Sequence, residues 1–363
     1  MERLRVGIVG VGNISGIYLK NLTTKFSDRV ELLGCADAIP ERAARATAEH
    51  SLPRTYQSPE QLLADPDIEL VLNLTIPLAH FDVCLAAVEA GKHTYVEKPL
   101  SVELDQAERL VAAAAANNVR VGGAPDTFLG GGLQTCRKLI DDGWIGKPIA
   151  AAAFMQNHGH ESWHPDPEFY YKTGGGPMFD MGPYYVTALV NLVGPVSRVS
   201  GSTRTTFPQR LVTSEPRKGT VIDVDVPTHI VGSLEFENGA IGTIITSFDV
   251  WAHHLPLIEI YGTEGSLSVP DPNGFGGDVK VKRFNHDEWH TIPLTHGHVE
   301  NSRGLGIAEA ADAIRHQRPQ RASSDLTHHV LEIMHGIHIA AEAGRRYDLK
   351  TPGVRPEPLP TDF

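Results

Sequence analysis

Hydrophobic positions in the first third of the chain form short continuous runs that alternate with longer segments of mixed polarity. Runs that are apolar at successive positions are typical of strands buried on both faces of a parallel sheet. Such strands are predicted over 6–9, 30–36, 70–74, 94–96 and 119–122. Helices are predicted between them, up to about residue 25 and over 40–50, 78–90 and 101–117, the last with an imperfect capping box at Ser101. The alternation predicts an α/β fold with a doubly wound parallel sheet.

The pattern changes beyond residue 124. After one amphipathic helix over 133–142, the runs lengthen and alternate polar with apolar residues, which favours antiparallel strands with one exposed face. These strands are predicted over 196–206, 229–236, 240–250, 257–261, 265–269 and 278–284, followed by helices over 304–316 and 326–343. We therefore expect a first domain over 1–124 and a second over 125–350. The second domain is expected to be α+β with a large open, mostly antiparallel sheet, followed by a tail over 351–363.

Composition narrows the classes of partner. The formal net charge of -12 argues against nucleic acid or an anionic membrane, because both require a basic surface. The three cysteines lie far apart, in no spacing typical of a metal site or a disulfide framework, so we expect free thiols in a reducing compartment. Without a signal-peptide pattern or an apolar run long enough to span a bilayer, a cytoplasmic location is expected.

Glycines follow the first predicted strand and precede the first predicted helix. Gly10 permits a tight turn, Gly12 lets the backbone approach a pyrophosphate, and the small Ser15 takes the place of a third glycine. Asp37 ends the second strand, where a carboxylate accepts hydrogen bonds from ribose hydroxyls and repels a 2′-phosphate. We therefore predict a Rossmann domain that prefers NAD, with NADP as the alternative because Arg42 is near. The expected cofactor contacts in this part of the chain are Gly10, Gly12, Asn13, Ile14 and Asp37.

Three further motifs follow in order along the chain. They are Thr-Ile-Pro-Leu-Ala-His over 75–80, Glu-Lys-Pro over 97–99, and Gly-Gly-Gly-Pro-Met-Phe-Asp-Met-Gly-Pro-Tyr over 174–184. In this order and spacing they resemble the Gfo/Idh/MocA family of oxidoreductases, which includes relatives of glucose–fructose oxidoreductase and inositol dehydrogenase. The resemblance covers nearly the whole chain.

The resemblance implies roles for individual residues. Lys98, with a cis peptide before Pro99, would lie near the nicotinamide and the substrate hydroxyl, where its ammonium would stabilise a developing alkoxide. Asp180 would position the substrate. Tyr184 stands where many members carry a histidine base, and an ammonium beside it would help the phenol act as acid and base; a merely packed tyrosine with another base is the alternative. Further cofactor contacts are expected at Thr75, Pro77, His80, Glu97, Lys98 and Trp163.

Histidines and aromatic residues crowd the segment over 158–172, just before the glycine run. Polar and aromatic side chains together suit carbohydrate recognition, and the histidine spacing fits no standard metal site. His160 belongs to this segment as a competing base. Asp126, where the chain crosses between the domains, is expected to face the substrate. The expected substrate contacts are Lys98, Asp126, His158, His164, Tyr170, Asp180 and Tyr184.

These residues predict an NAD(P)-dependent oxidoreductase that transfers hydride between a nicotinamide cofactor and a sugar-like polyol. The substrate is expected to bind between the domains, and the resemblance implies a homodimer or homotetramer. Two alternatives stay open. One is a glycoside hydrolase that oxidises C3 transiently with bound NAD. The other is a sensor or regulator without catalysis, against which the presence of Lys98, Asp180 and Tyr184 argues.

Overall fold

The computed structural model describes residues 2–363 and divides into two compact units. Unit 1 comprises the chain up to Leu129 together with Asn301–His328, and unit 2 comprises Gly130–Glu300 and His329–Phe363. This division differs from the expected one over 1–124, 125–350 and 351–363, chiefly because 301–328 returns to unit 1. The return has a physical cause, since helix α8 (Leu305–Arg315) packs against strands of the unit 1 sheet.

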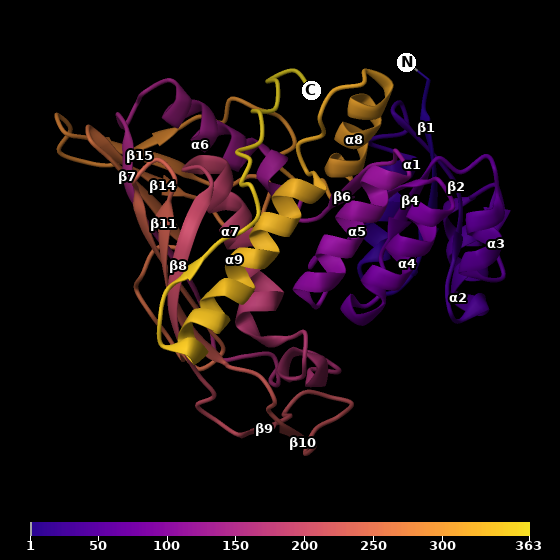
Figure 1. Ribbon diagram of the computed structural model, residues 1–363, viewed down its shortest axis with the longest axis horizontal. Coiled ribbons are helices and arrows are strands. Elements are labelled where there is room, and N and C mark those ends of the chain that lie inside the picture. Colours follow the sequence, from indigo (N-terminus) through magenta and orange to yellow (C-terminus); the bar gives the residue numbers. More distant parts are fainter. Residues whose placement is uncertain (1) are drawn as a thin grey trace. The chain divides into compact units, whose positions relative to one another are not determined.

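Unit 1 is built on a six-stranded sheet in the order β3-β2-β1-β4-β5-β6 (Figure 1). The strands are β1 (Leu4–Val9), β2 (Val30–Ala36), β3 (Arg54–Thr55), β4 (Leu70–Asn73), β5 (His93–Val96) and β6 (Val121–Gly123). Every neighbouring pair is parallel, which confirms the predicted doubly wound fold. The sheet grows outward in both directions from β1 and β4. Their carboxyl ends therefore form the switch point at which such sheets bind ligands.

Helices connect these strands and begin with clear sequence signals. They are α1 (Ser15–Thr23), α2 (Pro40–His50), α3 (Pro59–Ala64), α4 (Pro77–Glu89) and α5 (Leu104–Ala116). Proline occupies the first turn of α2, α3 and α4, where its missing N–H costs nothing. The prediction of a capping box at Ser101 is wrong. The box is formed by Glu103 and Gln106, and the Ser101 hydroxyl donates to the main-chain oxygen of Glu103 (2.8 Å).

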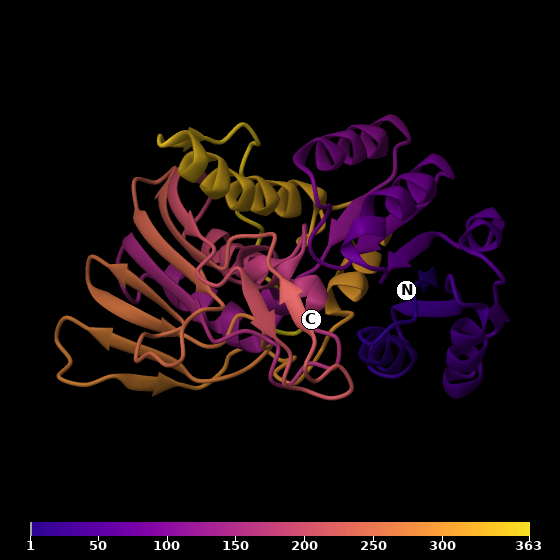
Figure 2. The same ribbon diagram turned by 90° about the horizontal axis from the view of Figure 1, so that it is seen from below.

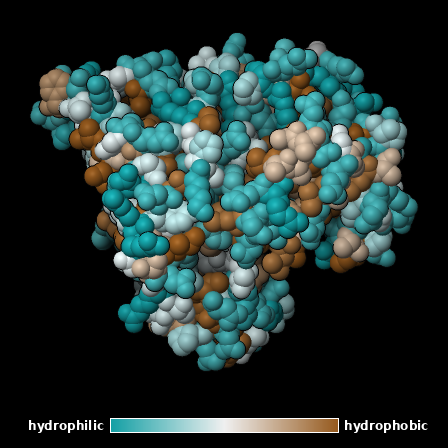
Figure 3. Space-filling view, viewed as in Figure 1, coloured by the Kyte–Doolittle hydropathy of each residue, from teal (hydrophilic) through white to brown (hydrophobic). Residues whose placement is uncertain are grey.

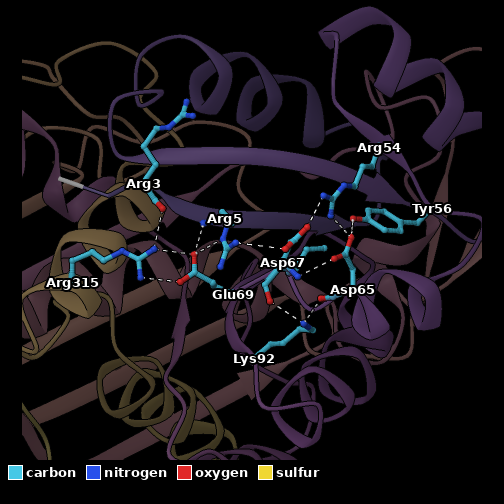
Figure 4. A network of polar contacts seen from close by, with 10 residues as sticks. Arg3, Arg5, Arg54, Tyr56, Asp65, Asp67, Glu69, Lys92 and Arg315 are labelled. Atoms are coloured by element: carbon cyan, nitrogen blue, oxygen red, sulfur yellow. Dashed lines mark hydrogen bonds and ion pairs between the residues drawn. The ribbon is translucent and has the colours of Figure 1, made fainter.

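A network of charged side chains joins α8 to the amino-terminal ends of β1 and β4 (Figure 4). Glu69 precedes β4 and accepts hydrogen bonds from the main-chain and side-chain nitrogens of Arg5 at 3.0 and 3.1 Å. Arg315 donates to both carboxylate oxygens of Glu69 at 2.9 and 2.8 Å. Nearby, the Lys92 ammonium donates to the main-chain oxygen of Asp65 (2.7 Å). Because the network lies at the end of the sheet opposite the switch point, its contribution is to the stability of unit 1.

Glu69→Gln is expected to lower the free energy of unfolding by about 2 kcal/mol at neutral pH. Burial raises the pKa of Glu69, but the hydrogen bonds from Arg315 and Arg5 outweigh it and lower that pKa to about 2. A depressed carboxyl pKa stabilises the folded state above the ordinary value of 4.5 and loses that contribution as the pH falls through about 2. Urea unfolding at neutral pH and at about pH 3 measures the difference between variant and wild type, which should narrow in acid.

Glu49→Gln is the matched control, because Glu49 is exposed on α2 and its nitrogen–oxygen distance to Arg45 is 4.0 Å. Its effect on unfolding is expected to stay below about 0.5 kcal/mol. A loss in Glu69→Gln that is equally large at both pH values would show that the carboxylate charge is not the cause.

Unit 2 is built on a nine-stranded sheet in the order β16-β15-β14-β13-β7-β12-β11-β8-β17. Its strands are β7 (Pro148–Gln156), β8 (Val196–Arg204), β11 (His229–Phe236), β12 (Ile241–Ser247), β13 (Ile258–Gly262), β14 (Gly265–Val269), β15 (Val279–Arg283), β16 (His290–Ile292) and β17 (Tyr347–Asp348). Only β7 and β12 pair in parallel, so the predicted, mostly antiparallel sheet is confirmed. A separate hairpin, β9 (Gln209–Leu211) and β10 (Val221–Asp223), was not predicted.

Helices α6 (Gly131–Asp141), α7 (Gly176–Leu192) and α9 (Ser324–Ala343) accompany this sheet (Figure 2). Helix α7 packs on β7 and β12. Helix α9 approaches β8 so closely that a Cβ at Gly201 would lie 2.4 Å from the main-chain oxygen of Ile337. Along β7, Ala151, Ala153 and Met155 are buried and the residues between them stay partly exposed. Such alternation is typical of a sheet covered on one face.

Hydrophilic residues cover most of the face seen in Figure 3, with hydrophobic residues singly or in small groups among them. None of the helices described within residues 2–363 is both long enough and apolar enough to cross a lipid bilayer.

Candidate active site

The glycine loop after β1 has the geometry that a bound dinucleotide requires. Gly10 has a φ of 94°, and a Cβ there would lie 2.8 Å from main-chain atoms of Leu74 and Thr75. Only glycine fits this position. Gly12 is exposed, and no described atom lies within 4 Å of a Cβ built on it. The loop is therefore closed toward the sheet and open on its outer side, where a pyrophosphate can approach the backbone.

The amino terminus of α1 follows this loop. Its N-cap position is Ile14, whose side chain forms no capping hydrogen bond. Asn13 and Ile14 are both exposed. The positive end of the helix dipole at these exposed residues suits a phosphate group.

Asp37 connects the end of β2 to the glycine loop. One carboxylate oxygen accepts the N–H of Val11 at 2.8 Å, and the other accepts the N–H of Ile39 at 2.9 Å. The residue is 8% exposed. Each oxygen keeps a second lone pair, so the carboxylate can hold the loop and still accept a hydrogen bond from a ribose hydroxyl.

The segment that carries Lys98 begins where β5 ends. Lys98 is partly exposed between buried neighbours, and the peptide between it and Pro99 is cis, as predicted. One Glu97 oxygen accepts the main-chain N–H of Lys98 (2.9 Å), and the other accepts the hydroxyl of Tyr18 on α1 (2.7 Å). Glu97 is thus placed to position Lys98 and α1 together.

His80 has a structural role that differs from the expected cofactor contact. Its ring is fully buried and lies between the main-chain oxygens of Pro99 (2.7 Å to Nδ1) and Thr75 (3.1 Å to Nε2). Burial lowers the pKa of His80 below its ordinary value, against the opposing effect of these carbonyl groups. Through these two carbonyl groups the buried ring joins the loops after β4 and β5. Thr75 and Pro77, which begin that first loop and α4, stay predicted cofactor contacts.

Asp126 also has a role other than the expected substrate contact. It is 1% exposed, and one carboxylate oxygen accepts the N–H groups of Gly304 (2.9 Å) and Gly306 (3.0 Å). Burial raises its pKa to about 6, although these N–H groups oppose the rise. Asp126 therefore caps α8 and holds the returning segment in unit 1.

In unit 2, Asp180 and Tyr184 lie one turn apart on α7, so they share a face of the helix. Tyr184 is 7% exposed, and the Asp180 side chain is 15% exposed. The His160 imidazole lies 3.6 Å from an Asp180 oxygen and is stacked on the Tyr170 ring at 3.7 Å between centroids. These contacts form one cluster of His160, Tyr170 and Asp180. It can donate hydrogen bonds to a polyol and accept them from it.

The structure separates the three predicted histidines. His160 enters the cluster with Asp180, although His158 and His164 were the expected substrate contacts. The His158 ring is instead stacked on Trp251 (3.4 Å between centroids). The His164 ring lies edge-on to Tyr170 (5.3 Å), and its Nδ1 accepts the N–H of Asp166. The sequence signal that distinguishes His160 from His158 is the glycine between them. Gly159 has a φ of 86° and turns the chain there.

A buried ion pair fixes this segment. Glu161 and Asp249 both bind the Arg210 guanidinium, whose side chain is 3% exposed. The Tyr171 hydroxyl donates to the other Glu161 oxygen. Burial and the Glu161 carboxylate both raise the pKa of Tyr171. Because Arg210 binds both carboxylates and Tyr171 binds Glu161, the main chain next to His160 is firmly held.

Among residues 2–363, no group of three or more His, Cys, Asp or Glu side chains is placed to hold a metal ion. Cys35, Cys84 and Cys136 are free and buried.

Comparison with known proteins identifies both parts of the chain. The description "Oxidoreductase family, NAD-binding Rossmann fold" matches residues 4–123, and the GFO/IDH/MocA C-terminal domain matches residues 133–268. A myo-inositol 2-dehydrogenase of Thermotoga maritima is 24% identical, with 73% of this chain and 74% of the relative covered. A scyllo-inositol 2-dehydrogenase (NAD(+)) of Bacillus subtilis is 28% identical over 74% of each chain. A solved levoglucosan dehydrogenase in complex with NADH and L-sorbose has the same fold, with a TM-score of 0.82 at 22% identity over 96% of this chain and 99% of that one.

Proposed function

The chain belongs to the Gfo/Idh/MocA family of NAD-binding oxidoreductases, and from this premise we propose that its substrate is a sugar or sugar-like polyol. The reaction is hydride transfer between NAD and a hydroxyl or ketone group. The relatives named as inositol and levoglucosan dehydrogenases support this substrate class. The observation that carries the proposal is the cluster of His160, Tyr170 and Asp180, because it brings together an imidazole, a phenol and a carboxylate that can form hydrogen bonds with a polyhydroxylated ligand.

The residues that would hold the cofactor are those of the open glycine loop, the α1 terminus and Asp37. Bound NAD supplies the hydride acceptor in the oxidative direction and the donor in the reverse. In our proposal the Lys98 ammonium stabilises the alkoxide that develops as the substrate hydroxyl loses its proton. Tyr184 accepts that proton, and Asp180 accepts a hydrogen bond from a neighbouring hydroxyl. Glu97 positions Lys98, and His160 orients Asp180.

One observation supports a second assignment of the base. His160 lies 3.6 Å from Asp180, and a histidine oriented by a carboxylate is a common general base. In that assignment Tyr184 packs against the substrate and the proton passes to His160. The two assignments differ in which single substitution removes turnover.

Asp37→Ala is expected to raise KM for NAD about tenfold and to narrow the preference for NAD over NADP. In the wild type the Asp37 carboxylate accepts hydrogen bonds from the ribose hydroxyls and repels a 2′-phosphate. It also holds the glycine loop by accepting the N–H of Val11. Initial rates with each cofactor at saturating substrate measure the effect. Asp28→Ala is the control, because the Asp28 side chain is 74% exposed. An unchanged preference would show that Asp37 only shapes the loop.

The proposal extends to assembly and location. The partly exposed sheet face that carries Ala152, Phe154 and Gln156 supports a homodimer or homotetramer, because an uncovered sheet face can be buried against a second copy. The three free cysteines support a cytoplasmic location.

A further inference from the structure

A cavity of about 680 Å³ lies in unit 2 beside the β9–β10 hairpin. Three parts of the chain line it: the segment after β7, the hairpin with the residues that flank it, and the loop after β12. The side chains that form the aromatic pocket, as we call it, are His158, Trp163, Phe207, Arg210, Leu211 and Trp251. Its volume is in the range of cavities that hold a ligand larger than a single hexose.

The aromatic pocket presents ring faces to solvent. Trp251 is 82% exposed and stacked on His158 with an interplanar angle of 14°, and Trp163 is 62% exposed. Exposed indole rings leave a large apolar area in contact with water. A flat ligand ring that covers them removes this area from water, which favours binding. The stacked His158 fixes the orientation of the Trp251 ring. The pocket is therefore suited to a ligand ring with an apolar face.

The charged groups at the pocket are paired within the protein. The Arg210 guanidinium binds both Glu161 and Asp249, which leaves one excess negative charge and disfavours an anionic ligand. The neutral polar residues Asn157, Ser162, Gln209 and Thr213 also line the pocket. A neutral ligand whose ring carries hydroxyl groups matches this chemistry.

The aromatic pocket adjoins the Asp180 cluster. Trp163 lines the pocket, and its ring lies 5.3 Å from that of His160 between centroids. His160 in turn lies 3.6 Å from Asp180. The pocket and the place proposed for the oxidised sugar are thus neighbours in unit 2, connected through the Trp163 and His160 rings.

We propose that the aromatic pocket binds the second ring of a glycoside, so that the substrate is a glycoside and not a free monosaccharide. This inference rests on the proposed function, because it places the oxidised sugar at Asp180. The second ring is a further sugar or an aromatic aglycone, both of which stack on indole through an apolar face. The two sources are distinguished by the substrates in the test.

The test measures kcat/KM of the full chain with NAD for one sugar in four forms: free, as methyl glycoside, as disaccharide and as phenyl glycoside. The two-ring substrates are expected to exceed the methyl glycoside about tenfold, mainly through KM. A preference for the disaccharide or the phenyl glycoside identifies the source of the ring. In Trp251→Ala the ratio of two-ring to methyl glycoside should fall toward one, whereas Trp289→Ala, another exposed tryptophan, keeps it.

Calorimetric titration of the phenyl glycoside and the disaccharide separates this inference from the proposed function. Binding that Trp251→Ala weakens, without turnover of any sugar, would contradict the proposed function and support the pocket. Turnover with equal kcat/KM for all four forms, unchanged in Trp251→Ala, would overturn the pocket and leave the function intact. A change of sedimentation coefficient in Trp251→Ala with unchanged affinity would also overturn it, because the pocket would then be covered by a second copy.

Discussion

Lys98→Ala is expected to lower kcat/KM by about 10³-fold while NAD binding changes little. In our account the ammonium acts only on charge that develops at the substrate oxygen, so its loss raises the barrier to the chemical step. Glu97 holds the main chain at Lys98, and that hydrogen bond does not involve the lysine side chain. The fold of the loop should therefore survive the substitution. Initial rates and cofactor titration by fluorescence measure the two quantities separately.

Lys20→Ala is the control for Lys98→Ala, because Lys20 is an exposed residue of α1 and its charge faces solvent. Its kcat/KM should match that of wild type. Wild-type turnover in Lys98→Ala would remove the lysine from the chemistry. A loss of NAD binding equal to the loss of kcat/KM would make it a cofactor contact instead.

Tyr184→Phe is expected to lower kcat by about 10²- to 10³-fold with little change in KM for NAD. The substitution removes only the hydroxyl, which accepts the substrate proton in our account. Tyr185→Phe is a matched control, because Tyr185 is the next residue of α7, is 2% exposed and has no proposed role in the reaction. Steady-state kinetics of both variants, with circular dichroism to verify folding, measure the effect.

His160→Gln tests the rival base. If His160 only orients Asp180, this variant raises KM for the sugar and leaves kcat within about tenfold of wild type. Loss of turnover in His160→Gln together with near-normal kcat in Tyr184→Phe would assign the base to His160. The pH dependence of kcat in each variant then shows which group's ionisation limits the rate.

The fold could be predicted where burial leaves a simple pattern. Strands β1, β2, β4, β5 and β6 are mostly apolar and buried and were predicted, whereas the two-residue β3 carries no such pattern. The antiparallel sheet followed from alternation along strands such as β11. The separate β9–β10 hairpin and the short edge strands β16 and β17 are held by tertiary pairing and leave no hydrophobic period to read.

The site was harder to predict, because it depends on contacts between distant segments. The motif around Lys98 could be recognised from three residues. The role of Asp126 could not, since its partner Gly304 lies 178 positions further along the chain. The choice between His158 and His160 depended on the left-handed turn at Gly159, which only glycine adopts readily. Sequence identifies candidate side chains, and the packing of unit 2 determines which of them meet.

The most direct test of the proposed function is the formation of reduced nicotinamide, followed by absorbance, with purified protein, NAD and a panel of inositols, anhydrosugars and glycosides. A substrate-dependent increase is expected with at least one member of the panel, and this increase should be lost in Lys98→Ala. No increase with any member, while the purified protein retains bound NAD, would contradict net hydride transfer to a sugar-like polyol and favour a reaction in which the cofactor is reduced only transiently.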